Sequence, residues 1–409
     1  DSFLRTAAGD RRLNTSNHEI DLCQIYGLDA PTARALRSGQ GGMLRSRSLP
    51  TGIFPALLFD AEGAVAEGFA GLPYVQGEPG KRVADVILPG AFGTALPPEE
   101  LERRRRALHA TGLERGSNTL LYAAFNAIFL REHNRICGAL AAVHPGWDDH
   151  RLFETARNVN TVLLLKLIIE EYINQLAGLP IRFRADPSFA EKQRWYRTNR
   201  ISIEFNLLYR WHSMIPDRLE LGDSVIEPLD YRFNNSLLES LGAERLIAAA
   251  SRQPAGRIGL GNVPRFMWQA EKSAIDFARS FRLQPFNAYR QCFGLKPYAS
   301  FGELTGNRDT AARLEALYGP SVDRLEFGVG LFAEHHDEDA SFGELLRAMV
   351  ACDAFSQALT NPLLSMNVFG PATFSEVGAR IIAETSRLEQ IVARNAPAGA
   401  GPVLADFHL

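Results

Sequence analysis

Two long helical segments in the middle of the chain constrain its fold more than any other feature. From Asn118 to Ala142, apolar residues recur at the spacing of one helix face, and Pro145 ends this pattern. A second helix is predicted from about His150 to Leu176, closed by Gly178. Its centre, Val162 to Ile169, carries a heavy apolar load, which is typical of a helix inside a core. The sequence therefore predicts a helical protein with a buried central helix.

The rest of the chain also favours helices. The first hundred residues are rich in Gly, Pro and Arg and show no sustained period, so we expect packed loops there. Further helical patterns, mostly bounded by Pro or Gly, cover Asn199 to Trp211, Ser236 to Ala250, Arg265 to Arg282, Thr310 to Leu317, Phe342 to Leu359 and Ser375 to Ala393. Strand alternation is weak and no internal repeat is visible. We expect residues 1–409 to form a single, mainly α domain.

Composition excludes several classes of protein. The 44 basic and 47 acidic residues give a net charge of −3, which argues against nucleic acid as a partner. The four cysteines lie far apart without a CxxC pair, so neither a zinc ribbon nor a disulfide-stapled scaffold is expected. Lys166 interrupts the most apolar stretch, and no transmembrane segment is predicted. The chain opens on Asp1 without Met or a signal peptide, so we expect an N-terminal part to be missing or removed.

One segment holds a pair of residues suited to redox chemistry, whereas the signatures GxxxxGK[ST], HExxH and GxSxG are absent. Tyr209 and His212 are three residues apart, and in a helix they would share a face with an axial rise of roughly 4.5 Å between them. Such a pair beside Phe205 and Trp211 is typical of a hydrogen-bonded core, so a functional interpretation needs a further reason. A haem supplies one, because imidazole is a standard proximal iron ligand and a nearby phenol can lose an electron to an oxidised iron centre.

The same segment resembles a known family. Tyr209, Trp211 and His212, followed by Pro216 and Asp217, resemble the catalytic helix of cyclooxygenases (prostaglandin endoperoxide synthases) and of related fatty-acid dioxygenases in the animal-type haem peroxidase superfamily. Other stretches stand in the family's order, namely Ile20 to Leu22, Ile25 to Gly27, Leu130 to Arg135, Ala177 to Gly178, Asn199 to Ile201, Leu283 to Asn287, Phe293 to Tyr298 and Thr373 to Val377. The resemblance covers nearly the whole chain and implies an N-terminally incomplete haem peroxidase (cyclooxygenase-like) catalytic domain.

The resemblance implies roles for individual residues. His212 resembles the proximal ligand of the haem iron, with haem b as the cofactor, and Tyr209 resembles the tyrosine whose radical takes hydrogen from a bound fatty acid. Tyr172 stands where the family has a second tyrosine, hydrogen-bonded to the first. Tyr298 stands where the family has a tyrosine near the proximal side, although a core tyrosine is the alternative. For His133 a structural hydrogen-bonding role is expected.

The resemblance also implies an acyl channel. Its expected wall, each member of which could equally be plain core, comprises Phe205, Leu208, Trp211, Ile168, Leu176 and Leu179. An ungapped match places Ala354 where cyclooxygenases have the serine that aspirin acetylates, Val350 on a channel glycine, and Arg347 on a small apolar residue. Leu179 replaces a tyrosine that assists carboxylate binding, and Asp1 takes the position of the distal histidine. Such a channel should not fold arachidonate for ring closure.

These expectations define one function and its alternatives. We expect haem-dependent oxygenation of a polyunsaturated fatty acid, linoleate or a similar one, to a linear hydroperoxide through a tyrosyl radical, with the fatty acid and dioxygen as partners. The alternatives are a prostaglandin-forming cyclooxygenase, a plain haem peroxidase, and a haem- or lipid-binding protein without turnover. The absence of a distal histidine disfavours the peroxidase. A cytoplasmic protein and one peripheral to a membrane both fit, and the oligomeric state is not predicted.

Overall fold

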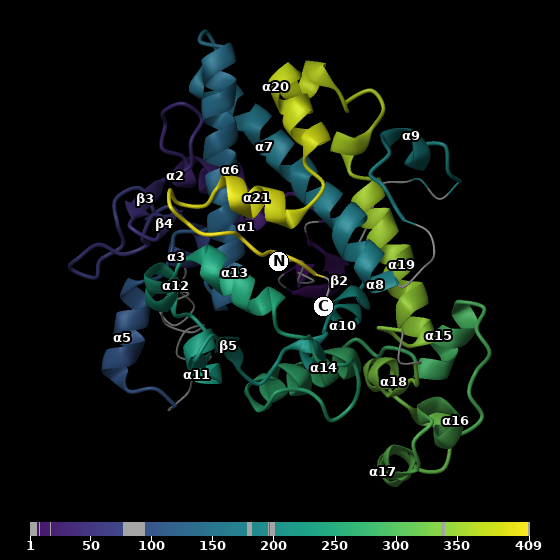
Figure 1. Ribbon diagram of the computed structural model, residues 1–409. Helices are drawn as coiled ribbons and strands as arrows, with labels where there is room; N and C mark the ends of the chain where they lie inside the picture. Colours follow the sequence, from purple (N-terminus) through teal and green to yellow (C-terminus); the bar gives the residue numbers. More distant parts are fainter. Residues whose placement is uncertain are drawn as a thin grey trace.

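The computed structural model describes residues 6–7, 9–16, 18–76, 95–177, 182–194, 196, 201–336 and 340–407. Helices dominate them, as the sequence predicts (Figure 1). The helices of seven or more residues are α2 (Ala30–Leu36), α5 (Pro98–Arg106), α6 (Leu120–Val143), α7 (Asp149–Leu167), α12 (Asn235–Leu241), α13 (Ala243–Ser251), α14 (Trp268–Ser280), α15 (Phe286–Cys292), α17 (Arg308–Tyr318), α18 (Phe327–Ala333), α19 (Glu344–Leu359), α20 (Pro371–Glu384) and α21 (Leu388–Arg394).

Shorter helical turns connect these helices. The α-helical ones are α1 (Cys23–Tyr26), α3 (Pro73–Gln76), α8 (Ile173–Ala177), α9 (Pro187–Ala190), α10 (Phe205–Leu208), α11 (Pro228–Tyr231) and α16 (Phe301–Thr305). The 3₁₀ turns are η3 (His212–Met214), η4 (Arg265–Met267), η5 (Val322–Arg324) and η6 (Pro362–Leu364), and η2 (Ile168–Tyr172) is a π-helix. No helix in the described part of the chain is both long and apolar enough to cross a bilayer.

Within the described residues, strands form only small antiparallel pairs, which agrees with the weak alternation in the sequence. The pairs are β1 (Thr6–Ala7) with β2 (Asp10–Asn14), β3 (Ser46–Leu49) with β4 (Gly52–Pro55), and β5 (Leu219–Leu221) with β6 (Ser224–Ile226). Gly222 has a φ of +63° where the chain turns from β5 to β6, a conformation that glycine adopts without a steric penalty. Two of these hairpins pack against helices, because Phe54 of β4 and Leu219 and Ile226 of the β5–β6 hairpin are buried in the apolar core.

Helices α6 and α7 form the centre of the fold and run side by side, with α20 packed against α7 (Figure 1). Each begins at a side-chain cap: Thr119 accepts a hydrogen bond from the backbone N–H of Tyr122, and Asp148 caps α7 in the same way. Between the two helices, the buried Tyr26 hydroxyl lies 2.9 Å from His133 Nδ1 and accepts a hydrogen bond from Asn160. His133 therefore has the structural role that the sequence predicts.

Several predicted helices are interrupted in the structure. The segment from His150 to Leu176 is continuous, but it passes through the π-helix η2 before it ends in α8. The segment from Ser236 to Ala250 is two helices, because Gly242 has a φ of +86° between α12 and α13. The segment from Asn199 to Trp211 contains only the four-residue helix α10 among its described residues. Local breaks of this kind leave no trace in apolar periodicity.

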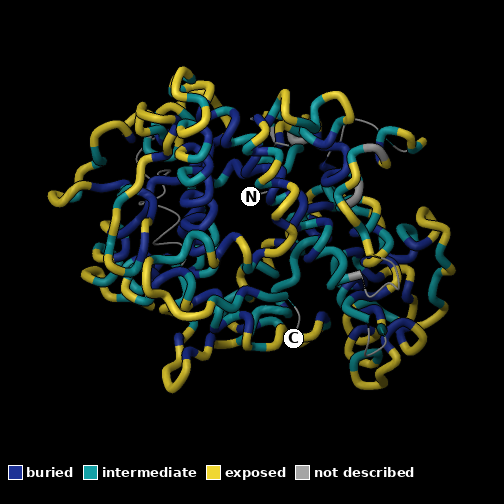
Figure 2. Tube along the Cα trace, turned by 45° about the horizontal axis from the view of Figure 1, so that its top comes forward, coloured by how far each residue is buried: buried dark blue, intermediate teal, exposed yellow. Residues whose placement is uncertain are grey.

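Buried apolar residues form two clusters (Figure 2). The larger one surrounds α6 and α7 and includes residues of α13 and α20. The smaller one joins α10, α14, α15, α18 and α19. Ile168 of η2 packs against the first cluster, whereas Tyr209 and Trp211 pack against the second. The residues expected to line the acyl channel are thus divided between the two clusters.

Candidate functional site

Tyr209 and His212 do not share a helix, so the expectation of a common helical face is wrong. Tyr209 is the C-cap of α10, with φ −108° and ψ 24°, and His212 begins the separate 3₁₀ turn η3. Side chains explain the break. The Trp211 indole N–H donates to the carbonyl of Leu208 at 2.5 Å, and the Arg210 guanidinium donates to the carbonyl of Asn206 at 2.9 Å. These bonds satisfy carbonyls that a longer helix would pair with backbone N–H groups.

The imidazole of His212 is held from one side by a carboxylate. Its Nδ1 hydrogen-bonds to Glu271 Oε1 on α14, and the His212 side chain is 17% exposed. Metal-binding histidines in proteins commonly have one ring nitrogen fixed by such a carboxylate, which orients the ring and makes the other nitrogen more basic. Nε2 is the nitrogen of His212 left for a metal. Glu271 lies 59 residues further along the chain, so the local motif around His212 does not indicate it.

Tyr209 has an acidic partner. Its hydroxyl donates to Asp353 Oδ2 at 2.8 Å, and its ring centroid lies 4.6 Å from that of Phe205 and 5.3 Å from that of Trp211. Burial raises the pKa of the Tyr209 phenol above its ordinary value of about 10, and the negative charge of Asp353 raises it further. The phenol is therefore neutral and oriented by a carboxyl group that accepts its proton as a hydrogen bond.

Asp353 lies on α19 and was not singled out in the sequence. Burial raises its pKa to about 6, although its hydrogen bonds from Tyr209 and from Gln357 both lower the pKa. Gln357 Nε2 donates to Asp353 Oδ2 at 2.7 Å from one helical turn away. One feature of the sequence could have indicated Asp353: it is an acidic residue inside the apolar stretch from Met349 to Phe355. An Asp among apolar residues is unfavourable unless it has a hydrogen-bond partner, so such a residue is a candidate for a structural or functional role.

Tyr172 shares the site with Tyr209, but the two phenols are not joined as the resemblance implied. Among the described residues, the Tyr209 hydroxyl bonds to Asp353, and no hydrogen bond links it to Tyr172. The Tyr172 ring instead stacks at 6.4 Å from Trp211 and meets Phe407 edge-on at 5.6 Å. The π-turn η2 ends at Tyr172. Single π-turns inside α-helices are frequent at functional sites.

Tyr298 lies in a different hydrogen-bond network. Its hydroxyl donates to Glu334 at 3.1 Å, and the Arg290 guanidinium stands 4.2 Å over its ring. Arg290 also pairs with both Glu334 and Glu344. These contacts fit the alternative of a core tyrosine, and the implied place near His212 has no contact in the described structure that supports it.

Most of the predicted channel residues line one cavity of about 350 Å³, whose wall is mainly apolar. Tyr172 and Tyr209 line it together with the predicted residues Phe205, Trp211, Ile168, Leu176, Arg347, Val350 and Ala354. Leu208 does not; it is 2% exposed in the second cluster, because the last residue of α10 faces the core. Leu179 and Asp1 lie outside the described residues. The structure thus brings four separate parts of the chain to one cavity.

Arg347 is the positively charged residue among those that line this cavity. It lies on α19 two turns before Asp353, and its side chain is exposed. In the described ranges, no salt bridge joins Arg347 to a carboxylate. A guanidinium at the rim of an apolar cavity can bind a carboxylate with two parallel hydrogen bonds. The cavity therefore has the character of a site for an amphipathic acid.

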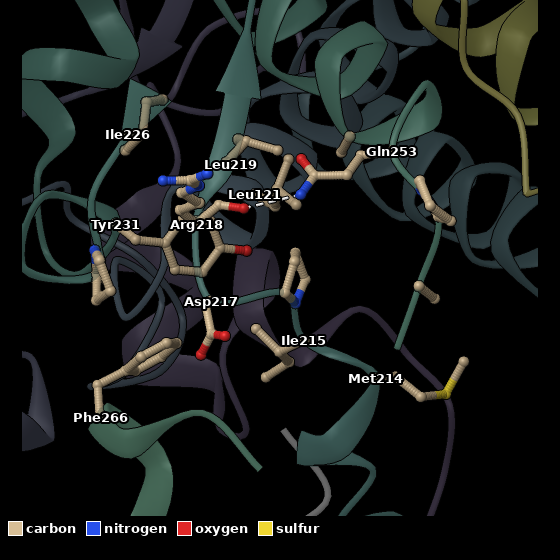
Figure 3. A pocket seen from close by; sticks show the side chains of 15 residues that line it. Leu121, Met214, Ile215, Asp217, Arg218, Leu219, Ile226, Tyr231, Gln253 and Phe266 are labelled. Atoms are coloured by element: carbon tan, nitrogen blue, oxygen red, sulfur yellow. Dashed lines mark hydrogen bonds between the residues drawn. The ribbon is translucent and has the colours of Figure 1, made fainter. Parts of the chain in front are cut away.

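Two further cavities border the chain after η3 begins. One, of about 250 Å³, is lined by Met214 and Ile215, and Figure 3 shows Tyr231 and Phe266 across from them. The other, of about 550 Å³, is lined by Met214 and by Tyr172, which also lines the apolar cavity. Both cavities are thus lined by Met214, the last residue of η3.

The sequence is similar to known haem proteins. The profile of the animal haem peroxidase family matches residues 3–401. Prostaglandin G/H synthase 1 from Oryctolagus cuniculus is 37% identical over 380 residues, which are 92% of this chain and 57% of that protein. Prostaglandin G/H synthase 2 from Equus caballus is 34% identical over 380 residues, with 92% and 57% covered. The chain thus spans less than two thirds of the length of these relatives.

Solved structures share the fold at lower identity. Peroxidase A from Dictyostelium discoideum matches with a TM-score of 0.70 at 20% identity, over 95% of this chain and 71% of that one. The fatty acid alpha-dioxygenase from Oryza sativa matches with a TM-score of 0.69 at 19% identity, over 93% and 64% of the two chains. These structural matches show the shared fold. The family profile over nearly the whole length shows that the chain belongs to the animal haem peroxidase family.

Proposed function

We propose that this protein oxygenates a long-chain unsaturated fatty acid to a hydroperoxide through a radical on Tyr209, with haem as cofactor. The position of Tyr209 carries the proposal: its side chain lines a mainly apolar cavity of about 350 Å³ and lies three residues before His212. Cavities of this size hold small ligands. The relatives named prostaglandin G/H synthase and the structural neighbour named fatty acid alpha-dioxygenase support the choice of an acyl substrate.

The residues beside η3 fit a haem. His212 would hold the iron through Nε2, while Glu271 keeps Nδ1 engaged and the ring oriented. The cofactor, when bound, supplies a one-electron oxidant next to the cavity. Haem b is the simplest choice, because an imidazole ligand alone is needed to hold it.

The chain's own residues then divide the work. Tyr209 gives up an electron and its hydroxyl proton, and its phenoxyl radical takes a hydrogen atom from an allylic carbon of the acyl chain. Dioxygen adds to the carbon radical that remains, and the peroxyl radical so formed takes a hydrogen atom from the re-formed Tyr209 hydroxyl. This gives the hydroperoxide and restores the phenoxyl radical. Phe205, Trp211 and Ile168 confine the acyl chain and exclude water, which protects both radicals from side reactions.

Arg347 is proposed to bind the substrate carboxylate. Asp353, the partner of Tyr209, is six residues further along α19, or about 9 Å along the helix axis. A carboxylate at Arg347 would therefore place a carbon in the middle of the acyl chain, and not the carbon next to the carboxyl group, near the Tyr209 hydroxyl. This placement favours attack at the allylic carbons of a polyunsaturated acid.

Replacing Arg347 by Met should weaken binding of the acid selectively. Loss of charged hydrogen bonds at a partly exposed site should raise KM for linoleate by about 10- to 100-fold, with a smaller effect on kcat. Methyl linoleate lacks the negative charge, so its KM should be similar for Arg347→Met and the parent. Steady-state oxygen uptake with both substrates measures this difference. An equal rise in KM for acid and ester would show that Arg347 does not bind the carboxylate.

Val350 and Ala354 favour a linear product. Both line the cavity, and Val350 fills space that the cyclooxygenase resemblance assigns to glycine. A narrowed channel hinders the bent acyl conformation that ring closure requires. Ring closure to a prostaglandin remains the second candidate, because the relatives most similar in sequence include prostaglandin G/H synthases.

Oxygen stoichiometry and product structure test the proposed function. Haem-loaded protein should consume one dioxygen per linoleate and yield a linear hydroperoxide, identified by mass spectrometry after reduction to the alcohol. With arachidonate, a cyclic product formed with two dioxygen molecules would favour the second candidate. Oxidation of a small phenol by peroxide, without oxygen uptake on any fatty acid, would contradict fatty-acid oxygenation.

A further inference from the structure

A partly buried carboxyl group accepts a hydrogen bond from the phenol that the proposed function oxidises. The hydrogen bond from the Tyr209 hydroxyl to Asp353 Oδ2 measures 2.8 Å, which is within the range for direct proton transfer between oxygens. Gln357, 6% exposed, donates to the same oxygen at 2.7 Å. The two donors fix the carboxyl group, so Oδ2 stays directed at the phenol.

We infer that Asp353 is the base that accepts the hydroxyl proton of Tyr209 when Tyr209 is oxidised. The inference rests on the proposed function and adds a residue to it. Oxidation of a phenol is strongly unfavourable if the proton stays on the oxygen, because a phenol radical cation is a very strong acid. A base already in hydrogen-bond contact lets electron and proton leave together.

The step balances in electrons and protons. One electron passes from Tyr209 to the oxidised haem of the proposed function, the Tyr209 O–H bond breaks, and an O–H bond forms at Asp353 Oδ2. The products are a neutral phenoxyl radical and a neutral carboxylic acid. The pair therefore loses the negative charge of the carboxylate, and no positive charge forms on the phenol. When the radical later takes a hydrogen atom from the substrate, that atom supplies both the electron and the proton of the re-formed phenol, so Asp353 keeps its proton in this step.

The surroundings of Asp353 support this role. The other charged or titratable side chains of the cavity are Tyr172 from η2, Asp21 from the segment before α1, Cys23 from α1, and Arg347 from α19 itself. None of them is bonded to Asp353 in the described structure, whose hydrogen bonds come from Tyr209 and Gln357. Asp353 is thus the base in direct contact with the phenol.

Protonation of Asp353 should switch the site off. Burial raises the pKa of Asp353 to about 6. Above this pH the carboxylate is ionised and can accept the proton; below it, the group is already protonated. Oxygenation should therefore fall as the pH decreases through about 6, and a variant without the carboxyl group should lack this decrease.

The decisive variant is Asp353→Asn, whose amide oxygen can still accept the hydrogen bonds but is not a base at neutral pH. Loss of a general base should lower kcat at pH 8 by about 100-fold, with KM little changed. Asp353→Glu should restore part of the rate. Ser356→Ala is the matched control, because Ser356 is three residues from Asp353 on the same helix and its hydroxyl donates to the Cys352 carbonyl at 2.8 Å.

Two readouts do not depend on turnover. Infrared difference spectra at pH 8 should show the carbonyl band of a protonated carboxyl group appearing with the tyrosyl radical in the parent and in Ser356→Ala, and not in Asp353→Asn. In haem-free protein, the raised pKa of Asp353 means that stability is lost as the pH rises from about 4 through about 6. The Tm of Asp353→Asn should therefore exceed that of the parent at pH 8 but not at pH 4.

The outcomes separate the two proposals. If the parent forms neither a tyrosyl radical nor a hydroperoxide, the proposed function fails. If the parent oxygenates linoleate and Asp353→Asn does so at the same rate with the same infrared spectrum, the proton goes elsewhere and only the inference about Asp353 fails. A variant that raises KM alone would also overturn it, because Asp353 would then act on substrate binding.

Discussion

Replacing Tyr209 by Phe should reduce fatty-acid oxygenation on the order of 1000-fold or more, while haem binding stays unchanged. The substitution removes the hydroxyl group that forms the radical and keeps the ring that packs against Phe205 and Trp211. Oxygen uptake with linoleate measures the activity, and the Soret band measures the bound haem. Oxygenation near the parent rate in Tyr209→Phe would show that the radical forms elsewhere.

Tyr172→Phe is the matched control, because it removes another phenol from the same cavity. The Tyr209 hydroxyl bonds to Asp353, so deleting the Tyr172 hydroxyl leaves the bonded pair intact. Tyr172→Phe should lower kcat by less than about 10-fold, because the free energy lost is roughly that of one hydrogen bond. The reverse result, with Tyr172→Phe inactive and Tyr209→Phe active, would assign the radical to Tyr172.

The long helices of this fold could be predicted because periodicity is a signal summed over many residues. The patterns at Asn118 to Ala142 and Phe342 to Leu359 correspond closely to α6 and α19. Short breaks could not be predicted in this way. At Gly242 one backbone conformation divides a helix, and after Leu208 two side-chain hydrogen bonds end α10. Such events depend on single residues whose partners are unknown from periodicity.

The candidate site was predictable only in part, for a related reason. Tyr209 and His212 stand out because the motif that contains them is local. Their polar partners are not local: Asp353 is 144 residues from Tyr209, and Glu271 is 59 residues from His212. Only the packing of α19 and α14 around α10 brings these carboxyl groups to the site, and without an alignment the sequence does not show such pairs.

The two carboxyl groups give the site an electrostatic asymmetry that the family motif alone does not reveal. Glu271 faces an imidazole, so it favours a ring that donates electron density to a metal. Asp353 faces a phenol, so it favours loss of a proton from that phenol. Arg347, six residues before Asp353 on α19, attracts an anion. A fatty acid bound with its carboxylate at Arg347 keeps its own charge away from Asp353, which avoids repulsion near Tyr209.

His212→Ala should abolish specific haem binding. The substitution removes the proposed iron ligand, and the loss of affinity should exceed the roughly 10- to 100-fold that loss of an outer-sphere partner costs. Haem titration followed at the Soret band measures the affinity. Glu271→Gln keeps a hydrogen-bonding side chain but removes the charge, so it should bind haem with an affinity between those of the parent and His212→Ala. His150→Ala serves as the control, because that side chain is 73% exposed on α7 and should not change haem binding.

Added imidazole distinguishes loss of the ligand from loss of the fold. If His212 holds the iron, the space left by His212→Ala admits free imidazole, and millimolar imidazole should restore a histidine-type Soret spectrum in this variant and in no other. Circular dichroism should show unchanged helix content, because His212 lies in the short 3₁₀ turn η3 and is not part of either apolar cluster. A variant that keeps the parent's Soret spectrum and oxygen uptake would show that another residue holds the iron, and the assignment of η3 as the proximal segment would then be wrong.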